Sequence, residues 1–166
     1  RAAAEAAFYQ SKGTSKEQLQ QQDIAKSARG YGASTYIDRA TGKTMIDVRG
    51  IPMQAANVRV GNQSVRMPIP STAQQAMHMI ASGMPYAQIG PNGTTASKVG
   101  MDNPLLKQIA ENTDKNLQTT TGRTGANPGV QAATRFVSEN FGYLPQKEQR
   151  MLFETILRRN GYAERQ

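Results

Sequence analysis

Residues 44–67 read TMIDVRGIPMQAANVRVGNQSVRM, and apolar and polar side chains alternate through both ends of this stretch. Alternation with a period of two is typical of a strand that buries one face and exposes the other. The first part places Ile46 and Val48 on one face, and the last part alternates valines with arginines on both sides of Gly61-Asn62. A Gly-Asn pair between two such runs indicates a tight hairpin turn. The stretch therefore predicts antiparallel strands in the middle of the chain.

A further strand is predicted just before this stretch. Residues 36–39 are joined to it by residues 40–42 (ATG), a short turn in which the glycine supplies a positive φ. Residues 68–70 (PIP) end the pattern, because proline cannot donate a ladder hydrogen bond. If the two hairpins form one sheet, the side chains expected to point inward are Ile46, Val48, Val58, Val60 and Val65.

Positive charge is concentrated in this β segment. The chain has 20 Lys and Arg against 12 Asp and Glu, a net charge of +8. Residues 26–66 hold seven of the bases but two of the acids, so +5 of the net charge lies in this quarter of the chain. Alternation is expected to turn Arg49, Arg59 and Arg66 outward on one face, where their planar forks of donors suit phosphate groups. The residues predicted to bind nucleic acid or another anion are Arg39, Lys43, Arg49, Arg59 and Arg66.

Two observations weigh on that prediction. Tyr31 and Tyr36 are the aromatic residues near the arginines, so the segment lacks the interleaved rings on which single-strand readers stack bases. An ordinary solvated sheet face would carry the same pattern of charges, and it is the alternative interpretation of the arginines.

Helices are predicted on both sides of the β segment. Residues 1–30 form a polar helical arm with a start at Ser15, and so few apolar side chains predict that it packs along another chain or stays mobile. Residues 71–82 form a short helix, and residues 102–104 (DNP) begin another with a cap and a proline in the first turn. Between them, residues 84–101 hold five Gly and Pro and predict a long irregular connection.

The last part of the chain has the clearest helical spacing. Residues 118–129 are rich in Thr and Gly and predict a flexible linker. Apolar side chains then recur at helical spacing up to Phe141, residues 142–144 turn the chain, and Pro145 opens a second amphipathic helix. Residues 130–166 are therefore expected to form a C-terminal helical hairpin.

These segments together predict an α+β chain that is mainly helical, with a small antiparallel β-hairpin element in the middle and a C-terminal helical hairpin. The expected segments are a polar helical arm (1–30), a basic β-hairpin segment (31–70), short helices with a long Gly/Pro loop (71–117), a flexible linker (118–129) and the helical hairpin (130–166).

The sequence offers few catalytic groups. The absence of Cys removes thiol nucleophiles, disulfides and cysteine zinc sites, and no phosphate-binding or dinucleotide-binding glycine motif is present. His78 is the single histidine, and between two methionines it is expected to pack rather than to catalyse. We expect no metal and no cofactor. Carboxylates leave one enzymatic route open, although they alternate with bases as on a solvated helix face: Glu111, Asp114, Glu139, Glu148 and Glu154.

Three classes of function remain after these exclusions. The first is a non-enzymatic structural or assembly component of a larger complex, a homo- or hetero-oligomer with other protein chains, whose basic face contacts DNA or RNA. A polar arm, a long neutral Gly/Pro segment and 37% hydrophobic residues favour it, because such a chain completes its burial against neighbours. The second is a stand-alone basic nucleic-acid-binding module. The third is a small carboxylate-dependent hydrolase.

The composition resembles that of phage virion and conjugation-apparatus proteins. Met makes up 8 of the 166 residues, and Gln, Asn and Ala are abundant. This resemblance implies an assembly role and a virion-associated or cytoplasmic location. No run of about 18 apolar residues occurs, so no membrane span is expected.

Overall fold

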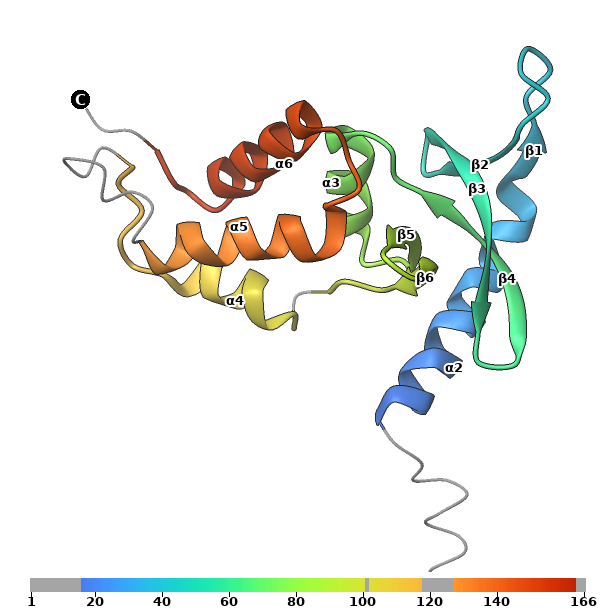
Figure 1. Ribbon diagram of the computed structural model, residues 1–166, viewed down its shortest axis with the longest axis horizontal. Helices are drawn as coiled ribbons and strands as arrows, with labels where there is room; N and C mark the ends of the chain where they lie inside the picture. Colours follow the sequence, from blue (N-terminus) through green and yellow to red (C-terminus); the bar gives the residue numbers. More distant parts are fainter. Residues whose placement is uncertain (1–15, 101, 118–126, 164–166) are drawn as a thin grey trace, which may run out of the picture.

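A computed structural model describes residues 16–100, 102–117 and 127–163. Helices hold 47% of the described residues and strands 27%, in a curled four-stranded antiparallel sheet and a separate two-stranded sheet. Figure 1 shows the sheet at one end of the molecule and three helices at the other. The expectation of a mainly helical chain with one small hairpin element is therefore wrong, because residues 35–69 form a four-stranded sheet and residues 86–97 add a second, two-stranded one.

The first half of the described chain contains the four-stranded sheet. Its elements, in order, are α2 (Lys16–Ala28), the 3-10 helix η1 (Arg29–Ser34), β1 (Thr35–Ile37), β2 (Thr44–Val48), β3 (Ile51–Val60) and β4 (Gln63–Ile69). The strands pair in sequence order, each antiparallel to the next. Both predicted hairpin turns are confirmed, with Gly42 at φ 72° and Gly61 at φ 61°.

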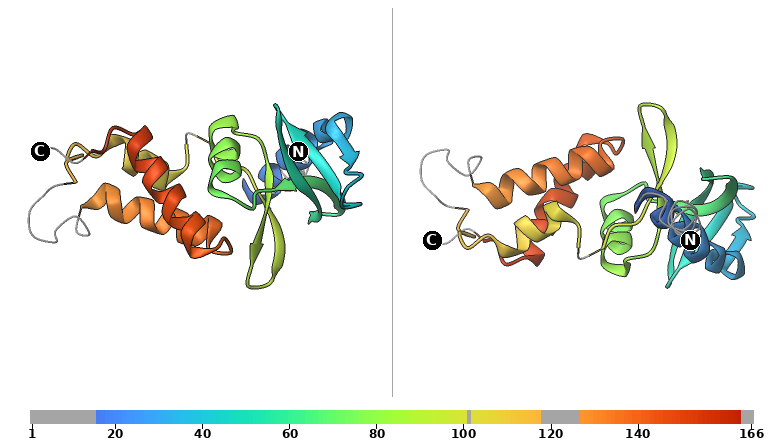
Figure 2. Two further views of the ribbon diagram at one scale, coloured as in Figure 1. Left: turned by 90° about the horizontal axis from the view of Figure 1, so that it is seen from above. Right: turned by 90° about the horizontal axis from the view of Figure 1, so that it is seen from below.

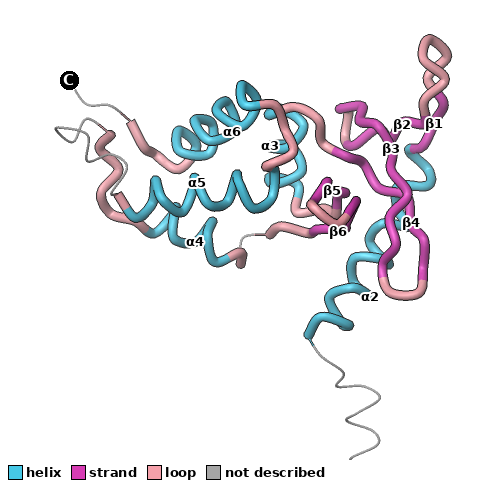
Figure 3. Tube along the Cα trace, viewed as in Figure 1, coloured by secondary structure: helices cyan, strands magenta, loops and turns pink. Residues whose placement is uncertain are grey.

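The second half contains a hairpin and four helices. Its elements are α3 (Ala73–Ser82), β5 (Tyr86–Gly90), β6 (Gly93–Ser97), α4 (Pro104–Glu111), α5 (Pro128–Phe141) and α6 (Gln146–Arg159). Figure 2 shows α3 and the β5–β6 hairpin between the four-stranded sheet and the helices α4, α5 and α6. Figure 3 shows the same division by type of structure. None of the helices in the described part of the chain combines the length and the hydropathy that crossing a membrane requires.

Strand β3 buries opposite faces in its two halves. In the first half Met53 is buried, and its neighbours in the ladder, such as Ile46 on β2, are buried with it. In the second half the buried residues are Val58 and Val60, which are an odd number of positions from Met53 and therefore lie on the other face. The register with β2 and β4 has no bulge, so the change comes from the curl of the sheet.

This change of face corrects the predicted inward set. All five residues of that set are buried, but they do not share a face. Ile46 and Val48 lie on the face of Met53, whereas Val58, Val60 and Val65 lie on the other one. A flat sheet would have exposed one of these groups, and the curl buries both.

Helix α2 covers the outer half of the β3–β4 hairpin, which it contacts on both strands. It buries Ile24, Ala25 and Ala28, and the ion pair between Lys98 Nζ and Asp23 Oδ2, 2.8 Å long, joins it to the segment after β6. Residues 16–28 were predicted to pack along another chain or to stay mobile, but they pack against the β3–β4 hairpin of the same chain. Three side chains on one side of the helix are enough for this contact. The start predicted at Ser15 lies outside the described residues.

Residues 84–101 are not an irregular connection. They contain the hairpin β5–β6, in which Gly90 pairs with Gly93 around a Pro-Asn turn. Tyr86 and Ala87 are fully buried, and the Tyr86 ring stacks on Phe141 at 5.4 Å between centroids. The hairpin also contacts β3 and β4, so it joins the sheet to the helical end of the molecule.

The helix boundaries follow the capping signals in the sequence. Thr72 caps α3 by accepting from Gln75 N, and Gly83 ends that helix in the left-handed region at φ 69°. Asn103 caps α4 by accepting from the backbone of the first turn, with Pro104 as its first residue. The predicted end of the first helix at Gly83 and the predicted start of the second at residues 102–104 are confirmed, whereas α3 begins at Ala73 and not at Ser71. The predicted pair of C-terminal helices is formed by α5 and α6, and α5 begins at Pro128, inside the segment predicted as a linker.

The segment predicted as a linker ends in an ordered cap. Residues 118–126 lie outside the described part, but Asn127 is buried and its side chain accepts from Gly129 N at 2.8 Å to start α5. Asn112 Nδ2 donates to Asn127 Oδ1 at 2.7 Å, and the Tyr162 hydroxyl donates to Ile109 O at 2.7 Å. These bonds fasten the C-terminal segment to α4 and α5.

This network predicts that Gly129→Ala destabilises the protein. A Cβ at this position would lie 1.8 Å from the Tyr162 hydroxyl and 2.8 Å from Asn112 Nδ2. We expect a loss of about 1–3 kcal/mol in the free energy of unfolding, typical of an overpacked site, measured by urea denaturation followed by circular dichroism. Gly30→Ala is the matched control, since a Cβ there meets nothing within 4 Å. Equal stability of the two variants would contradict the packing described.

Candidate anion-binding face

Two of the predicted arginines lie side by side on the exposed face of the β3–β4 hairpin. Asn57 pairs with Arg66 and Arg59 pairs with Ser64, so all four residues lie on one face. Each of the four is exposed, whereas Val58 and Val65 on the opposite face are buried. These four residues, Asn57, Arg59, Ser64 and Arg66, are called the arginine face below.

The arginine face carries no opposing charge. Its continuation across β1, β2 and the first half of β3 consists of apolar residues, threonines and Ala55, without any Asp or Glu. Asp47 on β2 lies on the other face, opposite Pro52. Within the described residues neither Arg59 nor Arg66 is in an ion pair with a carboxylate. Arg66 has one long contact, from its Nε to Asn57 Oδ1 at 3.5 Å.

A groove of about 420 Å³ runs beside the arginine face, between η1 and β4. Arg29, Thr35, Ser64 and Arg66 supply its polar lining. Arg29 Nη2 donates to Gln63 Oε1 at 2.9 Å, which holds this guanidinium against the start of β4. The groove thus places two guanidinium groups and the Ser64 hydroxyl around one hollow, donors of the kind that bind phosphate oxygens, while the Thr35 hydroxyl donates to Tyr31 O at 2.8 Å.

Arg29 is the site residue that sequence reasoning missed. Arg29 is the first residue of η1, directly after α2, and no pattern in the sequence around it indicates a contact with β4. The proximity depends on α2 packing across the β3–β4 hairpin, which a polar sequence with few apolar side chains does not predict. The one sequence signal for Arg29 as a site residue is its position within residues 26–66, where the positive charge is concentrated.

Arg49 is not on the arginine face. It is the first residue of the two-residue turn between β2 and β3, where Arg49 has φ 50° and Gly50 has φ 93°, as in a type I′ turn. Six residues of β3, 51–56, separate this turn from Asn57, the first residue of the arginine face, which is about 24 Å from Gly50 along an extended strand. Burial raises the pKa of the Tyr31 hydroxyl, and the nearby positive charge of Arg49 acts in the opposite direction.

Arg39 and Lys43 lie in the loop between β1 and β2. Thr41 Oγ1 donates to Asp38 Oδ2 at 2.7 Å and closes this loop, while both basic side chains remain exposed. Figure 1 shows the loop at the top of the view and the β3–β4 turn at the bottom. The structure therefore brings Arg59 and Arg66 together and adds Arg29, but it separates them from the other three predicted residues.

His78 has the structural role expected of it. It is partly buried on α3, and its Nε2 lies 2.7 Å from Val48 O, so this nitrogen donates to the backbone just before the β2–β3 turn. Gln75 Nε2 on the same helix donates to Pro52 O at 3.3 Å. Both contacts hold α3 against the start of β3.

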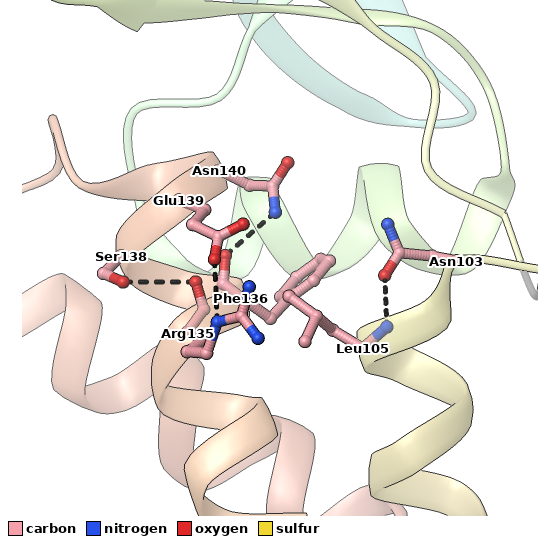
Figure 4. Close-up of polar contacts among 7 residues, drawn as sticks. All are labelled: Asn103, Leu105, Arg135, Phe136, Ser138, Glu139 and Asn140. Carbon is pink, nitrogen blue, oxygen red and sulfur yellow. Dashed lines mark hydrogen bonds and ion pairs between the residues drawn. The ribbon is translucent and has the colours of Figure 1, made fainter.

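Two of the carboxylates considered for a hydrolase make structural contacts. Glu139 pairs with Arg135 at 3.0 Å on α5, and Figure 4 shows this pair on the helix beside Phe136, whose ring is directed toward Leu105 on α4. Glu148 Oε2 accepts from Ala73 N at 2.8 Å and so serves the first turn of α3. In the described part of the chain no three His, Asp or Glu side chains gather as a metal site would require.

A second hollow, of about 660 Å³, lies between α3, α4 and α6. Its lining is mainly apolar, with Met77, Ile80, Leu106 and Ile156 among its residues. Lys107, Glu111 and Arg159 stand at its border. Figure 1 shows α4 and α6 at the opposite end of the molecule from the β3–β4 hairpin.

Comparison of the chain with models of protein families, with curated proteins and with solved structures finds no match.

The contact of Glu148 predicts an effect on stability. Glu148→Gln replaces a charged acceptor at the positive end of α3 by a neutral one, and we expect unfolding to require about 1 kcal/mol less free energy. Thermal denaturation measured by circular dichroism tests this. Glu154→Gln, on the exposed side of α6, is the control and should stay within about 0.5 kcal/mol of the unchanged protein. An unchanged melting curve for Glu148→Gln would show that the contact with α3 contributes nothing.

Proposed function

We propose that this chain is a non-enzymatic component of a larger nucleoprotein complex, and that it holds the phosphate groups of a nucleic acid in the groove between η1 and β4, beside the arginine face. The observation that carries the proposal is the convergence of Arg29 and Arg66 on one groove, with Arg59 beside it and no carboxylate among the described strand residues of that face.

The charge of the whole chain supports an anionic partner. A net charge of +8 attracts polynucleotides over long distances, and arginine is hydrated weakly enough to leave water for a phosphate at small cost. Each arginine that replaces a condensed counterion releases that ion, so the affinity should fall steeply with salt.

Two observations support a non-enzymatic role. Glu139 and Glu148 are occupied by Arg135 and by the backbone of α3, and the single histidine holds the β2–β3 turn. The polar lining of the groove consists of guanidinium and hydroxyl groups, which bind phosphate oxygens but have no adjacent general base.

The apolar hollow between α3, α4 and α6 supports membership of a larger complex. An open hollow of about 660 Å³ with a mainly apolar surface, to which Met77, Ile80, Leu106 and Ile156 contribute, is a surface that a neighbouring chain could cover. Such a contact distinguishes a component of a complex from a stand-alone nucleic-acid-binding module.

Replacing Arg29 and Arg66, the two arginines of the groove, should lower the affinity for DNA and make that affinity less dependent on salt. For the variant Arg29→Gln/Arg66→Gln we expect the slope of log affinity against log salt to fall by about 1.8, since each phosphate contact contributes about 0.9. Fluorescence anisotropy with a labelled duplex at several salt concentrations measures the slope. The light-scattering mass at low and high salt, with and without DNA, reports the assembly.

The control for this experiment removes equal charge elsewhere. Arg150 and Arg158 are exposed on α6, at the other end of the molecule, and Arg150→Gln/Arg158→Gln should leave the slope nearly unchanged. Equal losses in both variants would mean that binding follows net charge and not the groove. A protein that binds neither DNA nor RNA at low salt would refute the nucleic-acid part of the proposal.

A further inference from the structure

The arginine face has the side chains that read base pairs. Arginine donates two hydrogen bonds to the O6 and N7 atoms of guanine, asparagine pairs in the same way with adenine, and serine bonds to either base. Asn57, Arg59, Ser64 and Arg66 therefore include two guanine readers and one adenine reader on four adjoining positions. A face that held phosphate by charge alone would not require Asn57.

The β3–β4 hairpin presents these side chains on a firm two-stranded ribbon. Seven residue pairs join the strands from Gln54–Ile69 to Val60–Gln63. The face turned away from solvent buries Val58, Val60 and Met67, with α2 and the β5–β6 hairpin in contact with both strands. The exposed side chains thus stand on a backbone whose position is set by packing.

The dimensions of this ribbon match the major groove of duplex DNA. That groove is about 12 Å wide and admits a two-stranded antiparallel ribbon. Residues two apart on a strand, such as Asn57 and Arg59, lie about 6.8 Å apart, which is close to two base-pair steps of about 3.4 Å. Neighbouring exposed side chains can then face alternate base pairs.

We propose that Asn57 and Arg59 of the arginine face read base edges in the major groove of duplex DNA, while Arg29 and Arg66, which line the groove between η1 and β4, contact the DNA backbone. This inference rests on the proposed function and narrows its ligand to a duplex of preferred sequence. Single strands are disfavoured because the face carries no aromatic side chain for stacking, and double-stranded RNA because its major groove is too deep and narrow for side chains to read.

The test is a selection followed by one conservative substitution. The full chain is used to select duplexes from a library with a randomised central segment, and the affinity for a selected duplex is compared with that for a shuffled one by fluorescence anisotropy. We expect the selected duplex to bind at least tenfold more tightly. Arg59→Lys keeps the charge but loses the planar fork, so it should lower this preference by about tenfold while leaving the affinity for the shuffled duplex nearly unchanged.

Controls separate the possible outcomes. Arg158→Lys changes an exposed side chain on α6 and should leave the preference for the selected duplex intact. Asn57→Ala should also lower this preference, but at a different base pair from the one affected by Arg59→Lys. Two outcomes would overturn base reading but leave the proposed function standing. One is equal, strongly salt-dependent binding of all duplexes, and the other is tighter binding of single-stranded DNA or of RNA. Absence of binding to any nucleic acid would overturn both.

Discussion

At Ala55 and Ala56 the buried side of strand β3 changes from one face to the other, and both residues are only partly buried. Their small side chains leave room for the sheet to curl there, and on β4 the neighbouring Met67 and Pro68 are buried on opposite faces. Residues 51–53 of β3 pair with β2, Gln54 pairs with both neighbours, and residues 55–60 pair with β4. A strand that must bury both faces in turn cannot lie in a flat sheet.

This curl decides where the charges of the sheet can lie. Beyond the bend the face that carried Ile46 and Met53 is no longer needed for burial, so Arg59 and Arg66 occupy it in solvent. The opposite face of the same hairpin is covered by α2, and this packing brings Arg29 to the edge of β4. The curl of β3 thus explains why Arg59 and Arg66 share an exposed face and why Arg29 lies beside β4.

The local parts of this fold were predictable from the sequence. Turns at Gly42 and Gly61, the cap at Asn103 and the two C-terminal helices depend on short-range chemistry, and each lies where its signal falls. The β5–β6 hairpin was missed because its many Gly and Pro residues resemble a loop. Its Tyr86 ring stacks on Phe141, fifty-five positions further along the chain, and such a contact leaves no local pattern.

The candidate site was predictable only in part, for the same reason. Alternation correctly placed Arg59 and Arg66 on one face because they belong to one hairpin, whereas Arg49 continued the alternation of β2 but is a turn residue at positive φ. Side chains on the arginine face do not contribute to the buried side of their hairpin. Their identities are therefore constrained little by folding, so the alternation that predicts their exposure carries no information about what they contact.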